Sequence, residues 1–164
     1  MIKYCLWKWD AGKEALKTAL STEEGLGCCG YETLVKLVVQ HILNVTLDKD
    51  DNKNYDPDYD SPWDENNITV IDDGDYQGTL LFLIPNRTYQ PECDEYLMSH
   101  IDYGSCSVCD TLQGAQSIAS RRDRRLSPDQ VDAYMAICKD IVTNMIKPYD
   151  YGWMFDDWYD VAEA

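Results

Sequence analysis

The residues best suited to chemistry are Cys106 and Cys109, which form the only C-x-x-C motif in the chain, with Asp110 directly after them. A strand-like run ends before this motif and a helix-like run follows it. Backbone N–H groups at the start of a helix stabilise a thiolate, so one of the two cysteines is a candidate reactive thiol. Such a pair can serve in thiol exchange, bind zinc, or pack as two structural thiols.

Each of these roles has its own requirement. Zinc needs a second pair of ligands, and the remaining candidates do not repeat the spacing; they are Cys28, Cys29, Cys93 and His100. Thiol exchange of the thioredoxin type goes with a parallel βαβ arrangement, whereas the strands expected here are antiparallel. We therefore predict buried structural thiols and no cofactor. Zinc at Cys106 and Cys109, or thiol exchange, are the alternatives.

Negative charge is the second feature with functional meaning. The 164 residues include 30 acidic and 14 basic side chains, which give a formal net charge of −16. Such a surface repels nucleic acid and anionic membranes and attracts basic partners. We therefore expect a basic protein partner, without direct binding to nucleic acid or to a membrane.

The segment from Asp48 to Asp75 concentrates this charge, because it has eleven acidic residues against Lys49 and Lys53. Duplex DNA carries one charge per ~1.7 Å of its axis, so carboxylates along a rigid edge can occupy a groove built for that polyanion. A solvated acidic loop is the simpler alternative. The predicted partner-binding residues are Asp56, Asp58, Asp60, Trp63, Asp64, Glu65, Asp72, Asp73 and Asp75.

Sequence motifs for catalysis are missing. The stretch Asp48–Asp56 spaces oxygen donors like a calcium loop, but Lys53 and Tyr59 occupy the positions that need glycine and glutamate. The chain has no P-loop, dinucleotide fingerprint, G-x-S-x-G or H-E-x-x-H. We therefore predict no catalytic residues and no enzyme activity.

The elements that must position these residues follow from hydrophobic periodicity. Apolar runs bounded by glycine, proline and aspartate predict strands at 68–71, 78–84 and 95–103. Three- and four-residue spacing predicts helices at 10–20, 31–45, 105–120 and 127–147. Asp10, Ser105 and Ser127 are the expected N-caps of the first, third and fourth of these helices. Met1–Trp9 is expected to be a short strand or a packed arm.

The links between the predicted strands are too short for parallel crossovers, which favours an antiparallel meander. We therefore predict an α+β fold in which a small sheet of about three strands packs against two or three long helices. The chain is expected to be one domain, 1–164, with an acidic insertion at about 48–66 and an acidic-aromatic tail at about 149–164.

The number of cysteines and the N-terminal sequence indicate in which cellular compartment the protein is expected to act. Seven cysteines are an odd number, and Met1–Leu20 lacks the continuous apolar core of a secretory signal. No run reaches the ~18 apolar residues that a membrane span needs. A reducing cytoplasm with free thiols is therefore expected.

Two stretches carry a resemblance to a known group of proteins. Ile71–Thr79 and Tyr103–Gln113, the latter with the motif Y-G-S-C-S-x-C-D, resemble a family of small uncharacterised phage-encoded proteins. The similarity covers roughly Ile68 to Lys147. It implies a phage origin and a place of action in the host cytoplasm, and it brings no known catalytic residues.

Taken together, these features favour a phage accessory protein that binds and inhibits a host protein with a basic, nucleic-acid-binding surface. An anti-CRISPR or other anti-defence inhibitor that mimics nucleic acid is the specific hypothesis. The alternatives are a small metal- or thiol-dependent enzyme centred on Cys106, Cys109 and Asp110, or a structural, virion-associated module.

Overall fold

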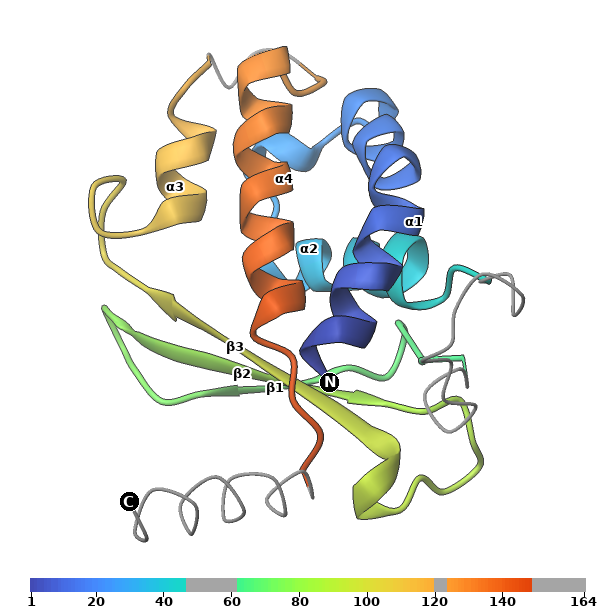
Figure 1. Cartoon of the computed structure of the whole chain (residues 1–164). Helices are drawn as coiled ribbons and strands as arrows, with labels where there is room; N and C mark the ends of the chain where they lie inside the picture. Colours follow the sequence, from blue (N-terminus) through green and yellow to red (C-terminus); the bar gives the residue numbers. More distant parts are fainter. Residues whose placement is uncertain (47–61, 120–123, 149–164) are drawn as a thin grey trace, which may run out of the picture.

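The chain folds into a layer of helices on one face of a three-stranded sheet, as Figure 1 shows. The structure is a computed structural model that describes residues 1–46, 62–119 and 124–148. It confirms the predicted α+β class and the small antiparallel sheet. The predicted acidic insertion is described only from residue 62, and the predicted tail at 149–164 lies outside the described residues.

The sheet is a meander with the strand order β1-β2-β3, as the short links between strands predict. Its strands are β1 (Thr69–Asp72), β2 (Gly78–Pro85) and β3 (Tyr96–Tyr103), each within one residue of the predicted bounds. A short 3-10 helix, η5 (Cys93–Glu95), leads into β3. Side chains alternate between the two faces of a strand. The buried residues of β2 and β3 face the helices; they include Phe82, Ile84, Leu97 and Ser99.

The N-terminal prediction is wrong, because Ile2–Thr22 is one continuous helix, α1. Its buried face recurs at three- and four-residue steps, the period of a helix, and includes Cys5, Trp9, Gly12, Leu16 and Ala19. In Met1–Trp9, Cys5 and Trp9 lie four residues apart on this buried face, which is the spacing of a helix and not of a strand. Asp10 is therefore not a cap but an exposed mid-helix residue, paired with Lys13 at 2.8 Å.

The second helical segment is confirmed, with one irregularity. A 3-10 turn, η1 (Leu26–Cys28), connects α1 to α2 (Tyr31–Val38), which continues directly into a π-helical turn, η2 (Val39–Leu43). Its η2 end packs against α1, whereas α2 packs against α4. Gly25, before η1, has φ 85°, a backbone conformation that glycine adopts without steric cost.

The C-terminal helix α4 (Pro128–Thr143) starts where the sequence predicts. Ser127 and Gln130 form a capping box, with Pro128 in the first turn. The helix ends before the predicted residue 147, because the next residues turn back to the sheet. Ile146 forms an antiparallel bridge with Met98 on the free edge of β3. Two hydrogen bonds of 2.8 and 2.9 Å close that bridge.

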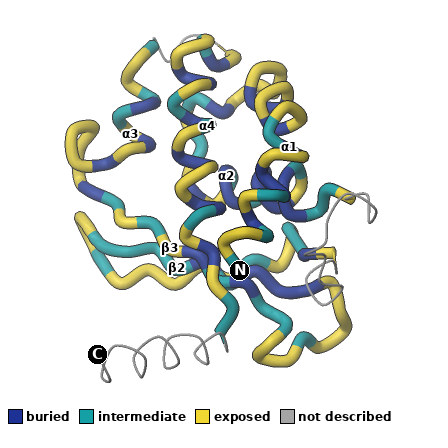
Figure 2. The backbone as a smooth tube through the Cα atoms, viewed as in Figure 1, coloured by how far each residue is buried: buried dark blue, intermediate teal, exposed yellow. Residues whose placement is uncertain are grey.

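One hydrophobic core joins the two layers. Figure 2 shows the buried positions on the inner sides of the helices and where the strands cross beneath them. Tyr134 of α4 is fully buried, and its hydroxyl donates to the Leu26 carbonyl at 2.8 Å. In the described part of the chain, no helix combines the length and the apolarity needed to cross a membrane.

Candidate functional site

The net negative charge of the described residues lies in one layer. The sheet layer, defined as residues 62–103, has nine acidic residues against one arginine, Arg87. The other described residues, almost all in or next to helices, have nine acidic and nine basic side chains. The helical layer is therefore neutral overall, whereas the sheet layer carries a formal charge of −8.

One acidic group lies at the β1–β2 hairpin, where Asp72, Asp73 and Asp75 surround the turn. The Asp72 carboxylate accepts hydrogen bonds from the Gly74 N–H at 3.1 Å and from the Tyr103 hydroxyl at 2.8 Å. Asp73 accepts from the Thr79 N–H at 2.6 Å. Two of the three carboxylates are thus held in place by the turn that they stabilise.

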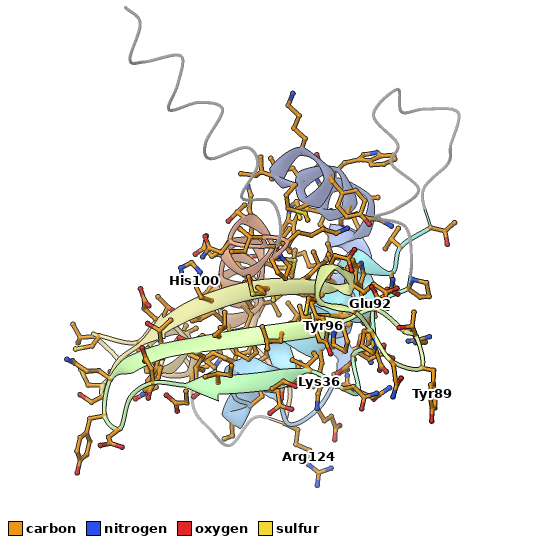
Figure 3. All side chains as sticks on the ribbon, turned by 90° about the horizontal axis from the view of Figure 1, so that it is seen from below. Lys36, Tyr89, Glu92, Tyr96, His100 and Arg124 are labelled. Atoms are coloured by element: carbon orange, nitrogen blue, oxygen red, sulfur yellow. The ribbon has the colours of Figure 1, made fainter. Side chains whose placement is uncertain are left out.

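Asp102 of β3 is a fourth carboxylate beside this hairpin. It accepts a hydrogen bond from the Thr79 hydroxyl of β2 at 2.8 Å. None of these four acids forms an ion pair with any residue that the structure describes. A second acidic group, which includes Glu92, lies at the opposite end of the sheet (Figure 3). The sheet layer therefore presents ordered, uncompensated carboxylates at both ends.

The pKa of the Tyr103 hydroxyl depends on this negative charge. Its hydrogen bond to Asp72, then partial desolvation and the charges of Asp72, Asp73 and Asp75, raise its pKa from the ordinary value of 10.0 to about 12. The protonated phenol is the favoured form, so this contact stabilises the fold below pH about 10 and is lost as the pH rises through about 12.

We expect the Asp72→Asn substitution to move the Tyr103 pKa back toward the ordinary value, because it removes the charged acceptor. The pKa can be measured by NMR titration of ring-labelled tyrosine, with Tyr103→Phe to assign the signal. Asp94→Asn, at the other end of the sheet, is the control and should leave the titration unchanged. A Tyr103 that titrates normally in the unmodified protein would contradict the hairpin geometry.

Of the other predicted contact residues, Trp63 does not lie on the surface. Trp63 is 1% exposed and lies in the core, so the expectation that it contacts a partner is wrong. The Asn44 side chain fixes it there, with hydrogen bonds of 2.8 and 2.9 Å to the Trp63 backbone. Asp56, Asp58 and Asp60 lie outside the described residues.

Asp64 and Glu65 have local structural partners. The Asp64 carboxylate accepts from the Asn67 side chain and the Asn66 N–H, and these hydrogen bonds lower its pKa. Glu65 is paired with Arg87 at 2.7 Å. Both acids belong to the sheet layer, but Arg87 compensates the charge of Glu65. Glu65 is therefore not part of the surplus charge, whereas Asp64 and the hairpin acids are.

The C-x-x-C motif forms a tight exposed turn at the end of β3 (Figure 1). The Cys106 carbonyl accepts hydrogen bonds from the Cys109 N–H at 2.9 Å and the Asp110 N–H at 2.8 Å. Both cysteines are exposed, so the prediction of buried structural thiols is wrong. Their sulfur atoms lie 2.9 Å apart.

The turn is anchored by Asp110, which is 4% exposed. Its carboxylate accepts from the Gln113 N–H at 2.8 Å, the Tyr31 hydroxyl at 3.1 Å and the Gly104 N–H at 3.3 Å. Asp110, not Ser105, is therefore the cap of the following helix, α3 (Thr111–Gln116). The spacing of Asp110 and Gln113 resembles a capping box and is the signal that would have identified this cap.

Gly104 fits the turn for a steric reason. A Cβ atom at this position would lie 2.5 Å from the Cys109 Cβ and 2.8 Å from the Cys109 carbonyl. Real carbon atoms do not approach so closely, so a larger residue here would displace Cys109. The Gln113 side chain closes the arrangement with a 3.1 Å hydrogen bond to the Gly104 carbonyl.

The two thiols have unequal acidity. The hydrogen bond between the two thiols and the backbone N–H groups of Val108 and Cys109 lower the pKa of Cys106. The same contact and the negative charge of an ionised Cys106 raise the pKa of Cys109. Among the described residues, no three histidine, cysteine or acidic side chains converge in a way that would hold a metal ion.

Comparison with known proteins gives no match to this chain, whether with protein-family models, with curated proteins or with solved structures.

Proposed function

We propose that this protein binds a basic, nucleic-acid-binding surface of another protein through its sheet layer and so keeps nucleic acid away from that surface. The observation that carries the proposal is the separation of charge. The described helical layer is neutral overall, whereas residues 62–103 have nine acidic side chains and one arginine. An even spread of the surplus acids over the described residues would give both layers a net negative charge.

The order of the carboxylates supports a specific contact over diffuse attraction. Asp72 and Asp73 accept hydrogen bonds from the backbone of their own hairpin, at 3.1 and 2.6 Å. Asp102 is held by Thr79 across the β2–β3 pair. Side chains that are ordered before binding lose less conformational entropy when a partner docks, so the same charge yields more affinity.

Complementary charge also favours rapid encounter. A field of one sign raises the association rate of an oppositely charged partner, and this increase falls with ionic strength. Carboxylates that replace phosphates would use the lysine and arginine contacts that normally hold a nucleic-acid backbone. In this proposal the protein is a phage product that acts in the host cytoplasm against a defence nuclease such as a CRISPR effector. The sequence resemblance described above motivates that choice of target.

The test is a charge reversal in the sheet layer. The triple variant replaces Asp75, Asp94 and Asp102 with lysine, because none of these three carboxylates accepts a backbone N–H in the structure. The matched control replaces Glu14, Glu23 and Asp129 of the helical layer with lysine, which changes the net charge by the same amount. Both variants should unfold at a similar temperature to the unmodified protein, because all six residues are exposed.

Each protein is immobilised and used to capture partners from a bacterial lysate, which are identified by mass spectrometry. We expect the sheet-layer variant to recover at least about tenfold less of the specific partner than the control variant. Duplex DNA added to the lysate should compete with capture, and raised salt should release the partner. Equal capture by the two variants, or capture that DNA does not reduce, contradicts the proposal.

A further inference from the structure

The C-x-x-C turn has no part in the charge-based function, yet it brings two free thiols into contact at the surface. Cys106 and Cys109 are both exposed, with their sulfur atoms 2.9 Å apart. A disulfide needs a sulfur–sulfur bond of about 2.05 Å and Cα atoms within about 6.8 Å of each other. The hydrogen bond from the Cys109 N–H to the Cys106 carbonyl makes this a β-turn, which keeps the Cα atoms of its end residues within about 7 Å.

The surroundings hold this pair rigidly. Asp110 follows Cys109 directly and is hydrogen bonded to the Gly104 N–H, the Gln113 N–H and the Tyr31 hydroxyl. The close packing of Gly104 on the Cys109 backbone fixes the other side of the turn. Val108, between the two cysteines, is 94% exposed and does not cover them. The thiols are therefore presented to solvent by a turn that is anchored in the core.

The geometry points to a further activity: we propose that Cys106 and Cys109 form a redox-active dithiol that reduces disulfides by thiol–disulfide exchange. A purely structural pair would not need both sulfur atoms exposed and in contact. A zinc site would need further ligands, and the described residues supply none near this pair. The inference does not depend on the charge-based function, because none of its atoms belongs to the sheet layer.

The reaction needs no oxidant or reductant other than the dithiol and the substrate disulfide. The Cys106 thiol loses its proton to solvent, and the thiolate attacks one sulfur of a disulfide R–S–S–R. The substrate bond breaks, a Cys106–S–R mixed disulfide forms, and the departing thiolate takes a proton from solvent. The Cys109 thiolate, after losing its own proton, then attacks the Cys106 sulfur and releases the second thiol. The dithiol is oxidised to one disulfide, and the substrate is reduced to two thiols.

The asymmetry of the pair assigns the two roles. The contact with Cys109 and two backbone N–H groups lower the pKa of Cys106, so the attack is assigned to Cys106. The pKa of Cys109 is raised by the same contact, which suits the resolving sulfur. The net charge of −16 favours substrates with positive charge around the disulfide. The substrate class is therefore a cationic small-molecule disulfide or a disulfide in a basic protein segment.

The test follows the fate of the two thiols in the full chain. Fully reduced protein is mixed with cystamine, a cationic disulfide, or with oxidised glutathione, an anionic one, and quenched with an alkylating reagent at successive times. Peptide mapping by mass spectrometry then locates mixed disulfides, internal disulfides and free thiols. We expect the unmodified protein to form an internal Cys106–Cys109 disulfide with both reagents. The rate with cystamine should be about tenfold higher at low salt.

Single variants separate the roles. Cys109→Ser should accumulate a stable mixed disulfide at Cys106, because the resolving sulfur is gone. Cys106→Ser should react at least about tenfold more slowly at Cys109, because the acidic thiol is gone. Cys93→Ser, which removes another exposed cysteine, is the control and should leave the internal disulfide unchanged. All three replace exposed thiols, so equal melting temperatures verify that each variant is folded.

Two results would overturn the inference. The first is independent modification of Cys106 and Cys109, with separate mixed disulfides that do not resolve into an internal one. The second is stoichiometric zinc in the reduced protein, detected by elemental analysis, together with protection of both thiols from alkylation. A basic peptide disulfide that is reduced with the kinetics of cystamine would support the predicted preference for cationic substrates.

Discussion

Replacing Asp110 with alanine is expected to lower the free energy of unfolding by about 3 kcal/mol. The carboxylate accepts three hydrogen bonds in a buried position, from Gln113, Tyr31 and Gly104. Alanine removes all three acceptor contacts. A buried donor without a partner costs about 1–3 kcal/mol, and loss of a helix cap costs about 1 kcal/mol.

Urea denaturation followed by circular dichroism measures this change. Asp140→Ala is the matched control, because Asp140 is an exposed helical aspartate and its loss should cost less than about 0.5 kcal/mol. Asp110→Asn should fall between the two, since the amide retains one acceptor oxygen. If Asp110→Ala is no more destabilising than Asp140→Ala, the carboxylate does not anchor the turn.

The expected effect on the thiols gives a second readout. The Asp110 N–H and the Cys109 N–H both donate to the Cys106 carbonyl, so a loosened Asp110 also loosens the turn. The Cys106 and Cys109 sulfur atoms would then separate more often from their 2.9 Å contact. Formation of the internal disulfide should therefore slow in Asp110→Ala, even at a temperature where the variant is fully folded.

The parts of the fold that were predicted correctly are those with a strong local signal. The apolar run of β2 ends at Pro85, and α4 begins with Ser127, Pro128 and Gln130, which together fix a helix start. Short links between the strands made the meander the natural topology. In each case the neighbouring residues alone determine the element.

The errors arose where a local signal had two meanings. Asp10 can cap a helix or sit on the exposed face of one, and only the packing of Cys5 and Trp9 against the core shows that α1 starts earlier. Ser105 and Asp110 are both good caps. The choice between them depends on Tyr31, which is 79 residues away in sequence from Asp110.

In the candidate sites, too, some features follow from the local sequence and others depend on residues that are distant in the chain. The acidic character of residues 62–103 follows from composition, so the charged layer could be predicted once the strands were placed. The burial of Trp63 could not, because it depends on the Asn44 side chain. The exposure of Cys106 and Cys109 was also mispredicted, since cysteine is among the most buried residue types and composition favours a core position.

Gly12 illustrates how strongly the helical layer depends on a contact that no sequence pattern reveals. Alanine is the better helix former by about 1 kcal/mol, so Gly12→Ala in the middle of α1 should stabilise an isolated helix. In the folded chain, however, a Cβ atom at this position would lie 2.1 Å from the His41 carbonyl oxygen and 3.0 Å from the Ile42 Cδ1. The obstacle is backbone, which cannot rotate away as a side chain can.

We therefore expect Gly12→Ala to destabilise the protein by about 3 kcal/mol, because α1 must move away from the π-helical turn η2. Gly27→Ala is the control, since a Cβ atom there meets nothing within 4 Å. Thermal and urea unfolding measure both variants. A stabilised Gly12→Ala would mean that helix propensity outweighs the contact and that α1 does not lie against His41. The expected loss would instead show that close approach of backbones, and not local propensity, selects glycine at this position.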